Sequence, residues 1–235
     1  YSNLGASSVA NVKPGNAVAA DLSMYYTTPI EMKKGLEGMD FNFGVAITNI
    51  GSKMTYTQDG IEANQDFIPA NLGLGFGLEL DIDKYNAVNI YFDVNKLLVP
   101  TPDTIDITGS ASGGPDGVPD YKTKSQISGL FTSFGDAPGG FSEELREFQI
   151  SAGIEYWYQQ QFAVRAGYFF ENKYKGDRQY FTVGLGVRYQ VFNLNFAYLV
   201  PSGSGINRNP LSNTLRFSLL FEFDKLEKKG SDVAN

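Results

Sequence analysis

The sequence predicts an all-β fold, a transmembrane antiparallel β-barrel. Nine segments alternate between two kinds of side chain with a period of two residues, which is the pattern of strands with two different faces. One of these faces carries no charged residue in any of the nine segments. The connections between the segments are alternately short and long, as in outer-membrane barrels.

The nine segments follow one another along the whole chain. Their approximate bounds are 17–27, 39–49, 70–81, 86–97, 147–158, 161–171, 179–190, 192–200 and 213–224. The uncharged face carries residues such as Leu72, Leu74 and Phe76, whereas the other face carries glycines and charges such as Glu155 and Arg165. Because an Arg or Lys facing lipid at the bilayer midplane costs ~2–4 kcal/mol, this segregation indicates a lipid-facing side.

A soluble β-sandwich also alternates, so it is the competing fold. The segments are longer than ordinary strands and match the ~9–11 residues that a tilted strand needs to cross a bilayer. Aromatic residues gather at segment ends, as at Tyr25, Tyr26 and 156–158, where they fit interfacial girdles. These features favour the barrel over the sandwich.

Strand parity then predicts the topology. With the short turns inside, the last strand runs towards the periplasm, and residues 225–235 form a periplasmic tail. The first strand runs the same way, so residues 1–16 form an outer loop that follows an upstream strand. Bacterial barrels have even numbers of strands. We therefore expect residues 1–224 to be the C-terminal part of a barrel, with 98–146 as a long outer loop.

Composition excludes several classes of function. No run of about 20 apolar residues exists, which excludes transmembrane helices. The chain has 0 Cys and 0 His, so it has no disulfides, no Ser-His-Asp triad and none of the common zinc sites. A net charge of -7 argues against nucleic acid as a partner. We predict no catalytic residue, no metal and no cofactor.

The connection 98–146 is the candidate working surface, because so long a connection is usually functional or disordered. Two short helices are predicted in it, at Ser125–Phe134 and at Ser142–Glu147, with Ser142 as the cap of the second. The candidate partner-binding residues are Leu98, Val99, Ile127, Leu130, Phe131, Phe134 and Phe141. The alternative is that these helices only fold over the barrel mouth.

Three other patterns receive structural interpretations. The stretch 114–120 has the composition of a calcium loop but lacks the ligand spacing and closing Glu, so a solvated acidic turn is favoured. The alternating glycines at 73–77 have no helix after them, which argues against a phosphate site and for room beside a plug, a loop or a ligand. The polar face also predicts ionic ladders, formed by Asp93, Glu155 and Glu222 with Arg165, Arg188 and Arg216.

The segment Asn95–Pro102, which ends a strand and opens the long loop, resembles the PorV family. The strand at Asn71–Gly75 and the closing strand share this resemblance. The family comprises barrel subunits of the type IX secretion system and is related to the FadL family of hydrophobic-compound transporters. The resemblance implies a FadL-like barrel of about fourteen strands, of which about nine lie in this chain.

The resemblance also implies a function. PorV-like proteins are integral to the outer membrane, with long loops outside and the C-terminus in the periplasm. They bind the C-terminal signal domain of secreted cargo proteins and shuttle the cargo from a large translocon barrel to attachment-complex proteins. Outer-membrane lipid is the remaining partner. The alternative is a FadL-like channel for hydrophobic small molecules, which predicts an apolar path through the lumen. An outer-membrane enzyme has the least support, because no His is present.

Overall fold

The computed structural model describes residues 17–31, 35–55, 65–102, 120–201 and 214–222. The chain divides into two compact units. The first unit, called here the loop unit, comprises residues 1–24, 45–73 and 95–148. The second, called the strand unit, comprises residues 25–44, 74–94 and 149–235.

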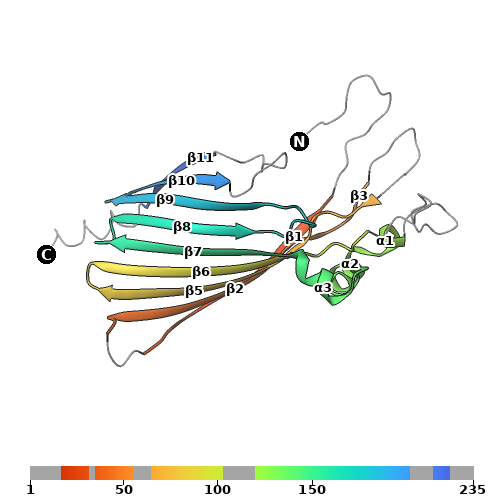
Figure 1. Ribbon diagram of the computed structural model, residues 1–235, viewed down its shortest axis with the longest axis horizontal. Coiled ribbons are helices and arrows are strands. Elements are labelled where there is room, and N and C mark those ends of the chain that lie inside the picture. The colour runs from red at the N-terminus through yellow and green to blue at the C-terminus, as the bar shows by residue number, and fades with distance from the viewer. Residues whose placement is uncertain (1–16, 32–34, 56–64, 103–119, 202–213, 223–235) are drawn as a thin grey trace, which may run out of the picture. The chain divides into compact units, whose positions relative to one another are not determined.

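Nine long strands make up one antiparallel sheet (Figure 1). They are β1 (Ala19–Pro29), β2 (Gly38–Gly51), β5 (Asn71–Asp83), β6 (Asn86–Leu97), β7 (Phe148–Tyr158), β8 (Phe162–Phe170), β9 (Gln179–Tyr189), β10 (Phe192–Pro201) and β11 (Leu215–Phe221). Each strand pairs with the next long strand along the chain. The predicted all-β antiparallel fold is therefore confirmed, and all nine predicted segments are strands with ends shifted by a few residues.

The short elements belong to the loop unit. A two-stranded hairpin, β3 (Met54–Thr55) and β4 (Gln65–Asp66), lies between β2 and β5 and was not predicted. The long connection contains α1 (Asp120–Thr123), α2 (Gln126–Thr132), α3 (Phe141–Glu144) and the 3₁₀ helix η1 (Leu145–Glu147). None of the helices in the described residues is long and apolar enough to cross a membrane.

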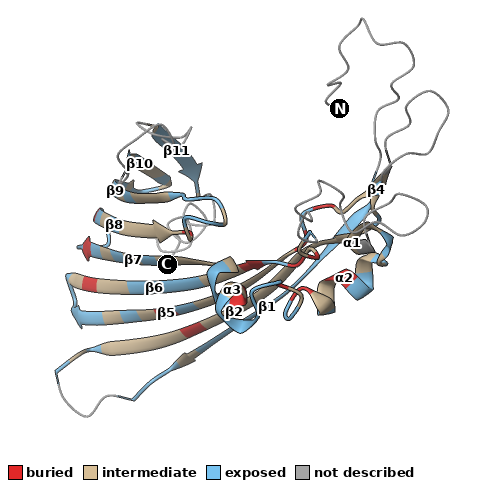
Figure 2. Cartoon of the chain, turned by 45° about the vertical axis from the view of Figure 1, so that its right-hand side comes forward, coloured by how far each residue is buried: buried red, intermediate tan, exposed pale blue. Residues whose placement is uncertain are grey.

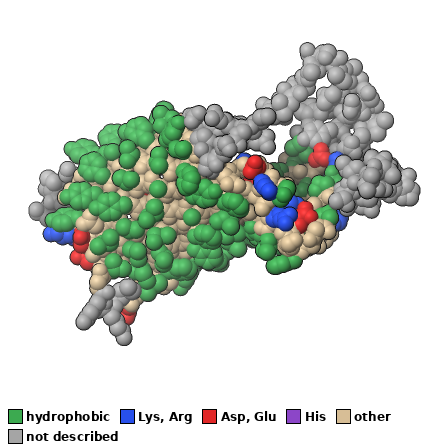
Figure 3. All heavy atoms as spheres, viewed as in Figure 1, with side chains coloured by type: hydrophobic (Ala, Val, Ile, Leu, Met, Phe, Trp, Pro, Cys, Tyr) green, Lys and Arg blue, Asp and Glu red, His purple; other side chains and the backbone are tan. Residues whose placement is uncertain are grey.

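The burial of the sheet is inverted relative to that of a soluble protein. In β9 the apolar residues Phe181, Val183 and Leu185 are exposed, whereas Gly186 on the opposite face is buried. Figure 2 shows that the long strands are mostly exposed or intermediate, with few buried positions. Hydrophobic side chains cover the visible face of the strands, and the charged side chains in that view lie towards the ends (Figure 3). A sandwich would bury this apolar face under a second sheet, and none covers it in the described part of the chain.

Among its described residues, the strand unit buries one small apolar cluster, on its polar face. Trp157 is flanked by Ala87 and Ala163, and Ala163 is its register partner on β8. The indole is only 6% exposed, and its Nε1 donates a hydrogen bond of 2.5 Å to Glu155. Trp157 is thus buried among polar neighbours, with a small alanine on each adjacent strand leaving room for its indole.

The turn between β7 and β8 is strained and gives a testable prediction. Gln159 and Gln160 have φ of 52° and 53°, and Gln161 N–H donates to Tyr158 O over 3.0 Å. These are the dihedrals of a type I′ turn, which favours Asn-Gly. Replacing the pair by Asn-Gly is expected to raise the free energy of unfolding by about 1 kcal/mol.

Urea unfolding of the folded protein in lipid vesicles measures this gain. The matched control is the same Asn-Gly replacement at Lys84 and Tyr85 in the β5–β6 turn, where neither residue is among those with positive φ. An equal change at both turns would contradict the conformational explanation.

Candidate functional site

The first predicted helix is confirmed as α2. Its N-cap is Ser125, whose side chain accepts a hydrogen bond of 3.2 Å from Ser128 N–H. Ser133 ends the helix, and its hydroxyl donates to Leu130 O over 2.9 Å. Ile127 and Phe131 lie one helical turn apart, and both are exposed, Phe131 by 76%.

The opposite side of α2 approaches the rest of the loop unit through a glycine. A Cβ atom at Gly129 would lie 3.0 Å from Phe67 Cε1 and 3.0 Å from Pro100 Cγ and Cδ. Pro100 is fully buried, so it has little space to move. Glycine at 129 therefore lets the helix lie directly against this proline.

Overpacking at this contact is the second prediction. Gly129→Val is expected to lower the free energy of unfolding by about 1–3 kcal/mol, although valine is the better helix former. Gly135→Val is the control, because a Cβ at Gly135 meets nothing within 4 Å. The free energy of unfolding is measured by titrating with denaturant and following protease cleavage of the loop. An equal loss of stability in Gly129→Val and Gly135→Val would contradict the packing argument.

The second predicted helix begins one residue earlier than expected. α3 starts at Phe141 with Gly140 as its N-cap, so the prediction of Ser142 as the cap is wrong. Gly140 has a φ of 68°, which suits glycine, and Glu143 Oε2 accepts a 2.8 Å hydrogen bond from Gly139 N–H. The exposed Phe141 then follows directly at the first helical position, where it is 78% exposed.

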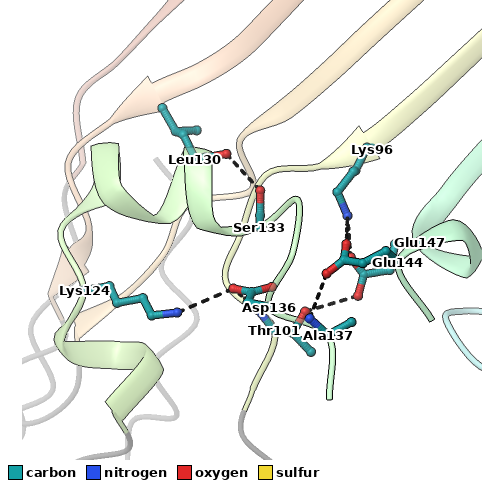
Figure 4. A network of polar contacts seen from close by, with 9 residues as sticks. All are labelled: Lys96, Thr101, Lys124, Leu130, Ser133, Asp136, Ala137, Glu144 and Glu147. Carbon is teal, nitrogen blue, oxygen red and sulfur yellow. Dashed lines mark hydrogen bonds and ion pairs between the residues drawn. The ribbon is translucent and has the colours of Figure 1, made fainter. Parts of the chain in front are cut away.

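A buried ion-pair cluster fixes α3 and η1 to the end of β6 (Figure 4). Lys96 is 1% exposed, and its Nζ lies 3.1 Å from Glu144 Oε2 and 2.5 Å from Glu147 Oε2. Glu144 Oε1 also accepts 2.7 Å from Ala137 N–H, and Thr101 Oγ1 donates to Glu147 Oε1 over 3.1 Å. One lysine thus joins a strand end, a loop and two short helices.

Aromatic rings complete the surroundings of this lysine. Lys96 Nζ is 5.4 Å from the centroid of the Phe148 ring and 5.8 Å from that of Phe134. Cation–π contacts of this kind are favourable when the charge is desolvated. They also show that Phe134, which follows α2, lies close to the cluster that holds α3.

A second set of contacts fixes α1 to the β3–β4 hairpin. Lys122 Nζ lies 2.8 Å from Asp66 Oδ1, and Lys53 Nζ donates 2.6 Å to Lys122 O while lying 4.4 Å from the Phe67 ring centroid. The hydrogen bond to Asp66 raises the pKa of Lys122, whereas burial lowers the pKa of Lys53. Lysines therefore hold the long connection at α1, in its middle, and at α3 and η1, near its C-terminal end.

The structure leaves most of the predicted partner-binding residues exposed. The name loop surface is used here for Ile127, Phe131, Phe134, Phe141 and Leu145, all of which are exposed large apolar residues of the loop unit. Leu145 was missed because it lies among charged residues, although its spacing of four from Phe141 puts it on the same helical side.

Three of the predicted residues do not belong to this surface. Leu130 and Val99 are half-buried. Leu98 is a correction, because it is only 4% exposed and its N–H donates 2.7 Å to Ala70 O. The pairing of residue 98 with residue 70 continues beyond the end of β6 and turns the Leu98 side chain into the core of the loop unit.

The polar face of the strand unit is organised around Glu155. Its register partner on β8 is Arg165, and the guanidinium Nε of Arg165 donates to Glu155 Oε2. Asn89 Nδ2 donates to the same carboxylate over 2.9 Å, and Arg165 Nη1 reaches Asn195 Oδ1 at 2.7 Å. One pair of the predicted ionic ladder is thus confirmed.

Two other predicted ladder positions differ. Arg188 and Arg216 form no ion pair with any described residue. The room beside the glycines is taken by side chains of neighbouring strands: Asn95, Asp93 and Tyr91 lie beside Gly73, Gly75 and Gly77, and Arg165 lies beside Gly184 and Gly186. Glycine on this face therefore accommodates long polar residues, where we had expected room for a plug, a loop or a ligand.

A cavity of about 420 Å³ opens on this polar face. Its lining residues are Asp40, Glu79, Asp81, Ala87, Asn89, Glu155, Trp157, Gln160, Arg165, Arg188, Asn193 and Asn195. Within the described ranges, no group of three or more acidic side chains is arranged to hold a metal ion. The calcium-like residues 114–119, the tail 225–235 and residues 1–16 lie outside the described residues.

The part of the chain that contains β1 to β6 carries the likeness to known proteins. Residues 2–104 match the family model of the type IX secretion system protein PorV. The PorV match includes Asn71–Gly75 and Asn95–Pro102, so the resemblance to the PorV family is confirmed over this part of the chain. The matched region ends before α1 and does not include the closing strand β11. The match does not extend to the FadL family. Among individually curated proteins, no significant match is found.

Proposed function

We propose that this chain is part of an outer-membrane β-barrel subunit of the type IX protein secretion system. In this role it binds secreted cargo through the C-terminal signal domain of the cargo and shuttles it from the translocon to the attachment complex. The observation that carries the proposal is the PorV match over residues 2–104. The finer steps rest on the loop surface and on the resemblance.

The exposed apolar face of the sheet supports a position in the membrane. Val183, Leu185 and Val187 of β9 and Phe217 of β11 are exposed, although each would be buried in a soluble protein. Contiguous apolar surface of this kind needs a nonpolar neighbour, and hydrocarbon supplies one for a barrel strand. The proposed orientation places the long loops outside the cell and the C-terminus in the periplasm.

The loop surface supports binding of a protein partner. Phe131 and Phe141 are exposed aromatic residues, and aromatic anchors contribute strongly to protein interfaces. Their helices are held by the Lys96 ion-pair cluster, so little conformational entropy is lost when a partner binds. The signal domain of cargo and the wall of the translocon barrel are the proposed partners.

A channel for hydrophobic small molecules receives no such support. The cavity of the strand unit is lined by Glu155, Arg165, Arg188 and further charged residues. An apolar compound entering it would have to desolvate these groups, which is costly. The secretion role is therefore the better-supported function.

Co-purification tests the proposal. The full-length protein, tagged and extracted from outer membranes with detergent, is expected to bring down a very large barrel and proteins that carry C-terminal signal domains. The same tag on an unrelated outer-membrane barrel is the control. Recovery of neither partner class, with the protein folded on heat-modifiability gels, would overturn the secretion role.

A deletion within the long connection 98–146 tests separately whether this connection is needed for secretion. Removing residues 103–140 is expected to abolish secretion, whereas removing residues 203–212 from another connection is expected to preserve it. Unchanged secretion after the first deletion would exclude the long connection as the docking site without excluding the secretion role.

A further inference from the structure

The cavity of the strand unit holds charges that the fold does not pair. Its lining includes four carboxylates, of Asp40, Glu79, Asp81 and Glu155, and two guanidiniums, of Arg165 and Arg188. Glu155 and Arg165 pair with each other, and Arg165 also donates to Asn195. Among the described residues, three carboxylates and one guanidinium of the cavity then remain without an opposite charge.

Arg188 is the unpaired cation. Its guanidinium carbon lies 4.6 Å from the centroid of the Trp157 ring, and its Nε is buried without a hydrogen-bond partner. Stacking on an indole fixes the plane of a guanidinium but satisfies none of its N–H groups. A half-buried guanidinium without an acceptor is costly, so this position is suited to an anionic oxygen group from outside the described chain.

The opposite wall of the cavity is acidic. Asp40 comes from β2 and Asp81 from β5, and neither carboxylate forms an ion pair with a described residue. Glu79 accepts a 2.9 Å hydrogen bond from Asn42 Nδ2 and forms no ion pair within the part of the chain that the structure describes. This wall is suited to an ammonium group.

Both walls line the same cavity, and the acidic strand nearer to Arg188 is β5, which carries Asp81. Arg188 stacks over Trp157 of β7, which is two strands from β5 in the sheet order. Two strand spacings correspond to about 10 Å between backbones. The strand β2, which carries Asp40, is three strands from β7. A simple anion would be repelled by the surplus of carboxylates, and a simple cation would leave Arg188 unpaired.

We propose that this cavity binds a small zwitterion. Its acidic group, a carboxylate or a phosphate, pairs with Arg188. Its ammonium group pairs with the acidic wall, where Asp81 is nearer to Arg188 in the sheet order than Asp40 is. Such a molecule arrives either as a free solute or as the headgroup of a zwitterionic lipid. The inference is independent of the secretion role, because it uses only the geometry of the strand unit.

Calorimetry on the full-length protein in an uncharged detergent tests this site. The probe is O-phosphoethanolamine, and the half-probes are inorganic phosphate and ethanolamine. We expect saturable binding of the probe, with dissociation constants at least about tenfold higher for either half-probe. Competition by phosphatidylethanolamine in nanodiscs identifies the lipid headgroup as the source, and its absence identifies a free solute.

Three variants complete the test. Arg188→Gln and Asp81→Asn are each expected to raise the dissociation constant about tenfold or more. Arg216→Gln is the matched control, because Arg216 alternates with the apolar residues of β11 and does not line the cavity. The proposal is overturned if the wild-type protein shows no saturable binding, if phosphate alone binds as tightly as the probe, or if Arg188→Gln has no larger effect than Arg216→Gln. Heat-modifiability gels verify that each variant is folded.

Discussion

Replacing Lys96 with Met is expected to destabilise the loop unit by about 3–5 kcal/mol. The substitution keeps the length of the side chain but removes the charge that Glu144 and Glu147 share. The side chain of Glu144 is only 6% exposed, so its carboxylate would remain buried without a cation. Removing one partner of a buried ion pair costs more than removing the whole pair, because the remaining charge is desolvated and unpaired.

Two probes separate the effect on the loop unit from the rest of the chain. The chain has 1 Trp, Trp157, which lies in the strand unit, so its fluorescence reports unfolding there. Protease cleavage within 120–147 reports opening of the loop unit. Lys96→Met is expected to accelerate cleavage at denaturant concentrations where Trp157 fluorescence is unchanged.

Control variants make the result specific. Lys84→Met removes an exposed lysine from the β5–β6 turn and is expected to change stability by less than about 0.5 kcal/mol. Lys96→Met combined with Glu144→Leu and Glu147→Leu is expected to recover much of the loss, since no buried charge then remains. If Lys96→Met is no more sensitive to protease than Lys84→Met, the ion-pair cluster does not hold the loop.

Replacing Phe131 and Phe141 together with Ser is expected to weaken partner binding at least about a hundredfold, since each anchoring aromatic contributes about 2 kcal/mol or more. Both side chains are more than three-quarters exposed in the described structure, at 76% and 78%. Their loss should therefore leave the free energy of unfolding within about 0.5 kcal/mol of the wild-type value. A large change in binding without a change in stability is the signature of a docking surface.

Binding of the full-length variant to an immobilised C-terminal signal domain, and separately to the purified translocon barrel, measures this effect. Tyr174→Ser is the matched control, because Tyr174 is a 67% exposed aromatic residue in the β8–β9 connection of the strand unit. Unchanged affinity of the double variant for both partners would refute the loop surface as the docking site. Loss of only one affinity would show which partner uses it.

The positions of the strands, and the face of each that is apolar, can be predicted from the amino-acid sequence. Strand periodicity is a local property, so the alternation around Phe181, Val183 and Leu185 was sufficient to assign β9 and its exposed side. The helix α2 was equally predictable, because Ser125 caps it through an interaction three residues away. These features depend on neighbours in the chain alone.

Contacts between residues far apart in the chain could be seen only in the folded structure. Lys96 and Glu144 are separated by 48 positions, and nothing local in either segment shows that they pair. Leu98 is buried where its N–H donates a hydrogen bond to Ala70 O, 28 positions earlier in the chain. Glu155 forms its ion pair with Arg165, so it is not the partner of Arg188. Period and capping arise from short-range backbone geometry, whereas burial and charge pairing arise from strand register and loop packing, which bring distant residues together.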